Sequence, residues 1–267
     1  MAEEWTEIGD GVFVRRHQSL DLNIGAVMCP GGILLVDTRA SHRQARDLQR
    51  SLDRFRLPVR WVVNTHHHWD HTFGNGEFGE SKIWGHERCA TALREHGEQM
   101  LRSVAKRAPD HADEFGEVVI TPPAFTFESE ASVSFGGREV TLRHFGRGHT
   151  DNDAVIFVDD AGVVFAGDLI EEGAPPSFSD SFPLEWPETA AALAAMSGGV
   201  VVPGHGGVVD AAFINTQRAE LEEVARLARE RHASGMTPAT AAGQGGPYPA
   251  SVLAAAFSRA WPHLEGR

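Results

Sequence analysis

The sequence Val59-Arg60-Trp61-Val62-Val63-Asn64-Thr65-His66-His67-His68-Trp69-Asp70-His71 joins a short apolar run to a dense group of imidazole and carboxylate side chains. The run 59–63 is rich in β-branched residues and is expected to form a buried strand. Side chains alternate along an extended segment, so His66 and His68 are expected to point the same way and bind one metal ion together. Asp70 and His71 can then face a second ion. Imidazole nitrogens and carboxylate oxygens are typical ligands of zinc, manganese and iron.

Three later residues stand in a similar setting. His149 follows a predicted strand over 139–145, Asp168 follows one over 163–166, and His205 follows one over 200–202. A glycine directly precedes each of them, which lets neighbouring backbone approach closely. Any one of them alone is more simply explained as a cap or a surface group. Their shared setting indicates instead that they join the histidine-rich segment at one site.

Apolar periodicity and turn residues predict strands and helices in two successive blocks. Further strands are expected over 11–15, 23–28, 33–36, 82–84, 132–135 and 154–158. Helices are expected from Ser41 to the residues before Pro58, over 87–108 with a break at Gly97, from near Pro187, around the stripe 214–228, and over 251–259. The segment 110–127 is expected to be a loop. This pattern suits an α/β fold in which two sheets pack together with helices outside, in a single domain over 1–267 with a helical C-terminal extension over 235–267.

The ordered pattern His-x-His-x-Asp-His, then His, Asp and His behind later strands, resembles the metallo-β-lactamase superfamily. The resemblance runs from about Gly11 to His232. It implies the four-layer αββα sandwich of that family. It also implies two metal sites, the first with His66, His68 and His149, the second with Asp70, His71 and His205, and Asp168 bridging both. Asp37 matches the family acid that orients a ligand histidine; an acid at the start of the following helix is the alternative for Asp37.

The resemblance implies a dinuclear metallo-hydrolase with two zinc ions per chain, iron or manganese being alternatives. A metal-bridging hydroxide would attack a carbonyl carbon, and Asp70 would orient it and later carry a proton. The expected bond is a thioester, a lactone or another ester- or amide-like bond, as in glyoxalase II-like and lactonase-like members. A β-lactam hydrolase is an alternative, but β-lactamases typically carry Cys or Ser in place of Asp168 and are exported. The other alternative is an iron oxidoreductase of the persulfide dioxygenase type, and the complete set of seven ligands disfavours it.

Charge and composition limit the kinds of molecule that this protein is expected to bind. The formal net charge is −13, from 24 basic and 37 acidic residues, and such a surface repels nucleic acid and anionic membranes. A small-molecule substrate is therefore expected. The N-terminal segment does not resemble a signal peptide, and a cytoplasmic location is expected. The segment 171–182, which contains Glu171, Glu172 and Asp180, follows Asp168 and is expected to border the site. The oligomeric state and the substrate itself are left open.

Overall fold

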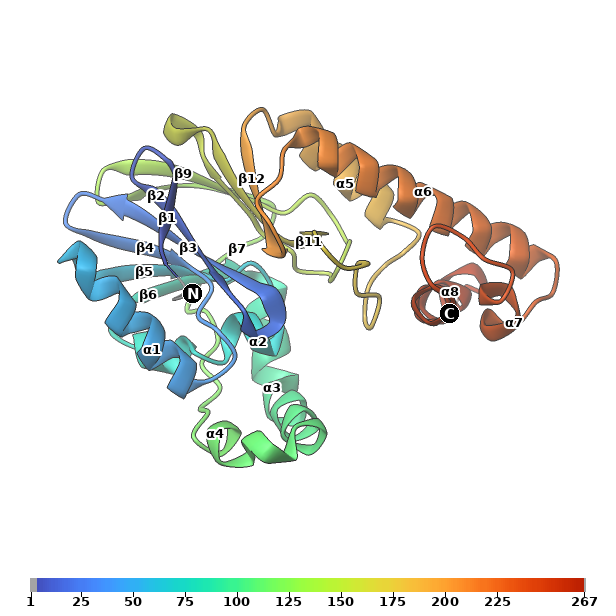
Figure 1. Cartoon of the computed structure of the whole chain (residues 1–267), viewed down its shortest axis with the longest axis horizontal. Helices are drawn as coiled ribbons and strands as arrows, with labels where there is room; N and C mark the ends of the chain where they lie inside the picture. The colour runs from blue at the N-terminus through green and yellow to red at the C-terminus, as the bar shows by residue number, and fades with distance from the viewer. Residues whose placement is uncertain (1–3, 267) are drawn as a thin grey trace.

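Two groups of strands form the framework of the molecule (Figure 1). The structure is a computed structural model that describes residues 4–266; residues 1–3 and 267, which the single-domain prediction includes, lie outside the described part. The first group comprises β1 (Thr6–Gly9), β2 (Val12–His17), β3 (Leu22–Cys29), β4 (Gly32–Val36), β5 (Val59–Val63), β6 (Lys82–His86) and β7 (Phe125–Phe127). The second comprises β8 (Glu130–Phe135), β9 (Arg138–Arg143), β10 (Val155–Val158), β11 (Val163–Glu171) and β12 (Val200–His205).

The two groups meet at one narrow junction. In the described residues the strand order is β7-β6-β5-β4-β3-β12-β11-β10-β9-β8, with β2 also paired to β3 and β1 to β2. The link between β3 and β12 is the single residue pair Leu22 and His205. Each group therefore forms its own sheet, and the two sheets can fold over one another about this junction.

Alternation along the strands shows why their sequences are continuously apolar. In β4, Leu34 and Val36 face the core between the two sheets, whereas Ile33 and Leu35 face the helix outside the first sheet. In β11, Val163 and Phe165 face the same inner core, and Val164 and Ala166 face the helices outside the second sheet. Successive residues point to opposite faces, so a strand buried on both faces needs apolar residues throughout.

Helices cover the outer face of each sheet. The first block of the chain supplies α1 (His42–Leu52), α2 (Trp69–Thr72), α3 (Glu87–Arg107) and α4 (Ala112–Gly116), and α1 packs on the first sheet. The second block supplies α5 (Trp186–Met196), α6 (Ala211–Ala233), α7 (Pro238–Ala242) and α8 (Ala250–Leu264), which pack on the second sheet and on one another. Figure 1 shows α1 beside the first sheet and α5 and α6 on the far side of β11 and β12. The predicted αββα sandwich is confirmed.

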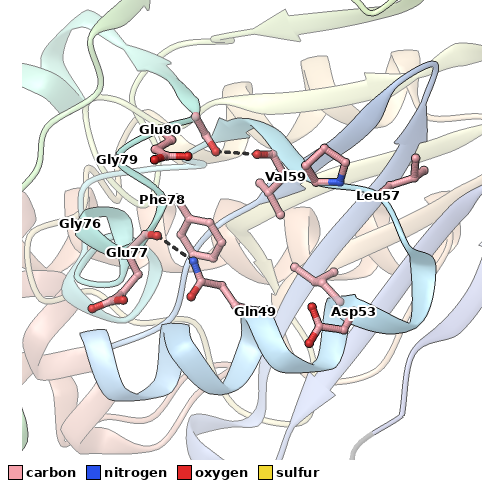
Figure 2. A pocket seen from close by; sticks show the side chains of 12 residues that line it. Gln49, Asp53, Leu57, Val59, Gly76, Glu77, Phe78, Gly79 and Glu80 are labelled. Carbon is pink, nitrogen blue, oxygen red and sulfur yellow. Dashed lines mark hydrogen bonds between the residues drawn. The ribbon is translucent and has the colours of Figure 1, made fainter.

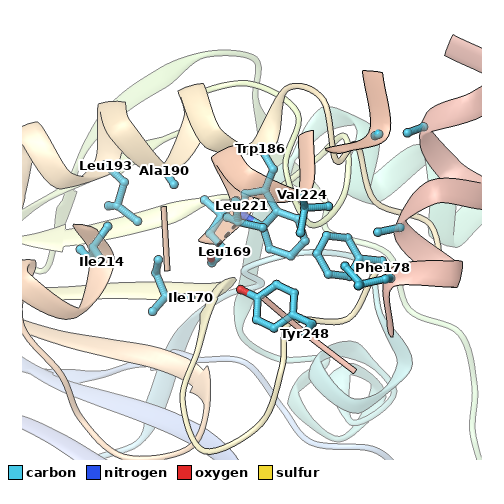
Figure 3. Close-up of a cluster of buried hydrophobic side chains, with 14 of the residues drawn as sticks. Leu169, Ile170, Phe178, Trp186, Ala190, Leu193, Ile214, Leu221, Val224 and Tyr248 are labelled. Carbon is cyan, nitrogen blue, oxygen red and sulfur yellow. Dashed lines mark hydrogen bonds between the residues drawn. The ribbon is translucent and has the colours of Figure 1, made fainter. Parts of the chain in front are cut away.

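The C-terminal helices share a core with the segment that follows Asp168 (Figure 3). The Trp186 indole is fully buried and donates a hydrogen bond to the Leu169 carbonyl oxygen, 3.2 Å away. The Phe178 ring packs between Trp186 and Tyr248, with ring centroids 5.4 and 6.1 Å apart. This core joins the C-terminal helices α7 and α8 to the end of β11 and to the segment between β11 and α5.

Three local predictions are wrong. The helix over 87–108 does not break at Gly97, because α3 runs unbroken and Gly97 instead makes room for Ile120, whose Cγ2 would lie 2.6 Å from a Cβ at that position. The segment 110–127, expected to be a loop, contains the short helix α4, with Phe115 buried, and the short strand β7. Strand β11 does not end before Asp168 but continues to Glu171 through an irregular register at Gly167.

Among residues 4–266, no helix is both long and apolar enough to cross a membrane.

Candidate metal centre

The seven predicted donor residues meet at one edge of the sandwich. His66 and His68 follow β5 directly, and Asp70 and His71 lie on the short helix α2. His149 comes from the loop between β9 and β10, Asp168 lies within β11, and His205 is the last residue of β12. The site therefore combines residues from both sheets.

Three imidazoles and one carboxylate form a first donor group, His66, His68, His149 and Asp168. His68 Nδ1 lies 3.0 Å from His66 Nε2 and 2.9 Å from His149 Nε2. Asp168 Oδ2 lies 3.4 Å from His149 Nε2 and 3.7 Å from His66 Nε2. His66 and His149 are at most 1% exposed. The four donor atoms thus converge on one point from three parts of the chain: the segment after β5, the loop between β9 and β10, and β11.

A second donor group, Asp70, His71 and His205, lies beside the first. Asp70 Oδ2 lies 3.8 Å from His71 Nε2 and 3.5 Å from His205 Nε2. Asp168 reaches this group as well, with Oδ1 3.2 Å from His71 Nε2 and Oδ2 3.3 Å from His205 Nε2. Asp168 is therefore the carboxylate that both groups share.

The spacing and chemistry of these atoms fit metal ions. Tetrahedral zinc with ligand bonds of 2.0–2.1 Å places neighbouring donor atoms about 3.3 Å apart, close to the separations in both groups. His71 Nε2 and Asp168 Oδ1 are also buried, and although they lie 3.2 Å apart neither makes a hydrogen bond of acceptable geometry with any described residue. Buried polar atoms are rarely left in this state unless an ion or water satisfies them. The donor set contains only imidazole and carboxylate, which suits zinc, manganese or iron.

Asp168 sets the electrostatics of the site. Burial opposes the charge on Asp168, but the imidazoles of His205 and His71 outweigh burial and hold the pKa of the carboxyl well below its ordinary value. Burial opposes protonation of His205 too, yet Asp168 raises the pKa of His205 to about 10. Burial lowers the pKa of His149 to about 4 and also lowers that of His66. The ionised Asp168 and the neutral imidazoles of His66 and His149 are in the forms that bind a cation, whereas His205 must release its proton before its nitrogen can do so.

Asp37 holds one imidazole of the second donor group from behind. Its Oδ2 lies 2.8 Å from His71 Nδ1, and its carboxylate accepts hydrogen bonds of 2.8 Å from the backbone and the hydroxyl of Thr65. With Nδ1 engaged, His71 presents Nε2 to the donor group. Helix α1 is capped by Ser41, which accepts a hydrogen bond from the Gln44 amide. The geometry therefore favours the orienting role for Asp37 over the role of a helix N-terminal acid.

The glycines before the three later donors are sterically required. A Cβ at Gly204 would lie 1.8 Å from Asp168 Oδ1, and one at Gly148 would lie 2.5 Å from Leu169 Cδ2. Gly167 has a φ of +55°, and a Cβ there would lie 2.8 Å from that of Thr65. Each glycine lets a second segment of the site pack directly on the backbone beside a donor residue.

Gly204→Ala is expected to displace the Asp168 carboxylate, because no rotation of a methyl group relieves a 1.8 Å contact. Overpacking of this kind costs about 1–3 kcal/mol of stability, so the melting temperature should fall together with metal content. Gly198→Ala is the matched control, since a Cβ there meets no atom within 4 Å. Calorimetry and elemental analysis of both variants test this. Normal metal content and melting temperature in Gly204→Ala would contradict the close approach.

The donor groups open into a cleft of about 660 Å³. Its apolar lining residues include Trp69, Met100 and Val104. Its acidic lining residues include Glu171, Glu172 and Asp180, so the segment 171–182 borders the site as expected. Among the described residues that line the cleft, Arg107 is the only arginine and no lysine is present. The lining of the cleft is therefore partly apolar and partly acidic.

Sequence reasoning missed how two residues approach the site. His67 lies outside both donor groups, but it lines the cleft with Nε2 3.6 Å from Asp180 Oδ2. Asp180 also lies 3.0 Å from His68 Nε2, although 112 positions separate the two residues. The available signal was the acidic segment directly behind Asp168, which indicates nearness to the site but not which histidine Asp180 contacts.

A second cavity, of about 590 Å³, lies apart from the donor groups between α1 and the turn 76–81 (Figure 2). Its walls are tied by hydrogen bonds from Gln49 to the Glu77 carbonyl oxygen and from Ser81 to the Val59 carbonyl oxygen. Of the described groups of residues that could hold a metal, none lies in this cavity.

Curated relatives of this chain include metal-dependent enzymes. It is 24% identical over 185 residues to a protein named metallo-beta-lactamase type 2 from Bacillus cereus. The matched region covers 67% of this chain and 64% of that protein. It is 27% identical over 209 residues to the alpha subunit of a 2,4-dinitroanisole O-demethylase from a Nocardioides strain. The matched region covers 75% of this chain and 54% of that subunit. The chain thus spans less than two thirds of the length of these relatives.

Solved structures share the fold. The metallo-beta-lactamase FIM-1 from Pseudomonas aeruginosa, in a mono-zinc form, matches with a TM-score of 0.64 and 21% identity, covering 83% of this chain and 96% of that one. The sec-alkylsulfatase Pisa1 from a Pseudomonas species matches with a TM-score of 0.79 and 14% identity, covering 98% of this chain and 50% of that one. A profile of the metallo-beta-lactamase superfamily matches residues 27–222, most of the sequence. The chain belongs to the metallo-beta-lactamase superfamily.

Proposed function

We propose that this protein is a hydrolase that uses two metal ions, with zinc as the expected metal. The observation that carries the proposal is the position of Asp168, whose two carboxylate oxygens reach both donor groups. A carboxylate in this position offsets the repulsion between two cations and sets their spacing. His66, His68 and His149 would hold one ion, and Asp70, His71 and His205 the other.

Two bound cations would supply a water nucleophile at neutral pH, because together they lower the pKa of a shared water toward ~7. The protein positions the rest of the reaction. Asp70 is close to both imidazoles of the second donor group and lines the cleft, so it can orient the water and accept its proton. Trp69 and Val104 offer an apolar surface in the same cleft, which would hold the non-reacting part of a substrate and exclude water.

The cleft favours a thioester, a lactone or another uncharged ester over a β-lactam. A β-lactam antibiotic carries a carboxylate, and among the described residues that line the cleft Arg107 is the only arginine or lysine that could pair with it, beside the acidic Glu172 and Asp180. β-Lactam hydrolysis remains the second candidate, because two curated relatives from Bacillus species carry the name metallo-beta-lactamase type 2. The two complete donor groups disfavour a mononuclear iron oxidoreductase.

Metal analysis combined with a substrate panel tests the proposal. Protein purified without chelator is expected to contain about two metal ions per chain. Catalytic efficiency on a thioester or a lactone is expected to exceed that on a β-lactam. A clear preference for the β-lactam would overturn the substrate class, and full activity at one metal per chain would overturn the dinuclear site. Oxygen consumption with a persulfide in place of hydrolysis would instead support the iron enzyme.

A further inference from the structure

The first feature behind this inference is the contact between Asp180 and His68. Both carboxylate oxygens of Asp180 lie close to His68 Nε2, at 3.1 and 3.0 Å. The other ring nitrogen, Nδ1, is the atom that faces His66 and His149 in the first donor group. A carboxylate at Nε2 therefore fixes the ring orientation of His68 and leaves the Nδ1 lone pair for a metal ion.

The contact mirrors the one that Asp37 makes on the second donor group. Asp37 lies at the far nitrogen of His71, and Asp180 lies at the far nitrogen of His68. Asp37 belongs to the rigid end of β4, whereas Asp180 lies on a long segment between β11 and α5. Asp180 therefore needs a separate support.

Helix α8 provides that support. Arg259 donates hydrogen bonds of 3.1 Å to the carbonyl oxygens of Asp180 and Ser181. Its guanidinium also lies 5.9 Å from the centroid of the Phe182 ring. On the other side of Asp180, Phe178 is buried against Trp186 and Tyr248, as Figure 3 shows. The backbone of the segment is thus held on both sides of Asp180, while the side chain of Asp180 is left to face His68.

We propose that Asp180 is a positioning residue for the metal ligand His68, and that α8 holds Asp180 in place through Arg259. The proposal rests on the proposed metal site and deepens it, because it gives the C-terminal helices a role in metal binding. It also implies that a change about 80 positions further along the chain, at Arg259, acts on the same ligand as a change at Asp180.

A double-mutant cycle on the full-length protein tests the proposal. The variants are Asp180→Ala, Arg259→Ala and the pair, and the first readout is zinc affinity measured by competition with a chromogenic chelator. Losing the partner of a ligand histidine typically weakens metal binding or activity by roughly 10–100-fold. The zinc affinity of Asp180→Ala should therefore fall by about that factor. Arg259→Ala should show a smaller loss in the same direction. The pair should be no worse than Asp180→Ala alone, because both changes act on one contact.

Two controls separate positioning from general stability. Arg226→Ala removes an exposed arginine of α6 that contacts Glu223 and Glu230, and should leave zinc affinity unchanged. Asp180→Asn keeps an oxygen that can accept from His68, and should recover part of the lost affinity. With the preferred substrate, Asp180→Ala should lower kcat more than it raises KM.

Several results would overturn the proposal. Wild-type zinc affinity in Asp180→Ala, with only a lower melting temperature of the metal-free protein, would reduce Asp180 to a structural residue. Fully additive losses in the double variant would remove Arg259 from the pathway. Three zinc ions in the wild type that fall to two in Asp180→Ala would make Asp180 a ligand, with His67 and His68, instead of a positioning residue. If the wild type itself bound no zinc, the proposed function would fail first and this role with it.

Discussion

Asp168→Ala is expected to remove at least one metal ion per chain and nearly abolish hydrolysis while the chain stays folded. The carboxylate reaches His71, His149 and His205 at 3.2–3.4 Å, so its loss affects both donor groups at once. Without a shared anion, two cations held by the two donor groups would repel each other strongly in this buried site, and at least one is expected to be lost. Elemental analysis and turnover on the preferred substrate, read beside a circular-dichroism melt, measure the effect.

The control for this variant is Asp159→Ala, which removes an exposed acid from the turn that enters β11. It should leave metal content, turnover and melting temperature unchanged. Asp168 as a mere turn acid would give a different result: stability would fall, and metal content per folded chain would hold. Retained activity with normal metal content in Asp168→Ala would remove this residue from the site.

Asp70→Asn is expected to keep the fold and lower turnover by about 10²–10⁴-fold, the usual contribution of a group that moves a proton in the transition state. The amide has nearly the shape of the carboxylate, but it is a poorer metal ligand and cannot accept a proton. Asp70 is in addition the acid of the second donor group that lines the cleft, so it is within reach of a substrate. Steady-state kinetics and metal analysis at matched zinc concentrations measure the effect.

Asp47→Asn provides the matched substitution, because Asp47 is an exposed acid of α1 whose partner is the neighbouring Arg50. Its kcat and metal content should equal those of the wild type. The role given to Asp70 would be wrong if Asp70→Asn held two metal ions and turned over substrate at a near-native rate.

The fold and most of the candidate site could be predicted from the sequence because their signals are local. Continuous apolar runs such as 33–36 and 163–166 are explained by strands buried on both faces. The donors lie just beyond apolar runs of this kind, although Asp168 and His205 turn out to be part of β11 and β12 themselves. The glycine before each later donor indicates a close approach of backbone, which the structure shows at Gly204. Strand ends and donor residues thus carry their own markers.

What could not be predicted depends on contacts between distant residues or on features that look alike locally. Gly97 has the appearance of a helix break, and only its contact with Ile120 shows that it is a packing position. Gly167 has the appearance of a strand end, but its positive φ lets the strand bend and continue through Asp168. The contacts of Asp180 with His68 and Arg259 span 112 and 79 positions, and no periodicity in the sequence encodes them.

The narrow junction between the two sheets has a consequence for the order in which the molecule matures. Four of the seven proposed ligands lie before residue 72, and the other three lie after residue 148, the last of them at the end of β12. A chain still emerging from the ribosome therefore carries half a site for most of its synthesis. Only closure of the second sheet on the first, sealed where Leu22 meets His205, brings the two halves together. Neither donor group is complete until residues from both sheets have met, so the metal-binding site is a product of the final packing of the two sheets.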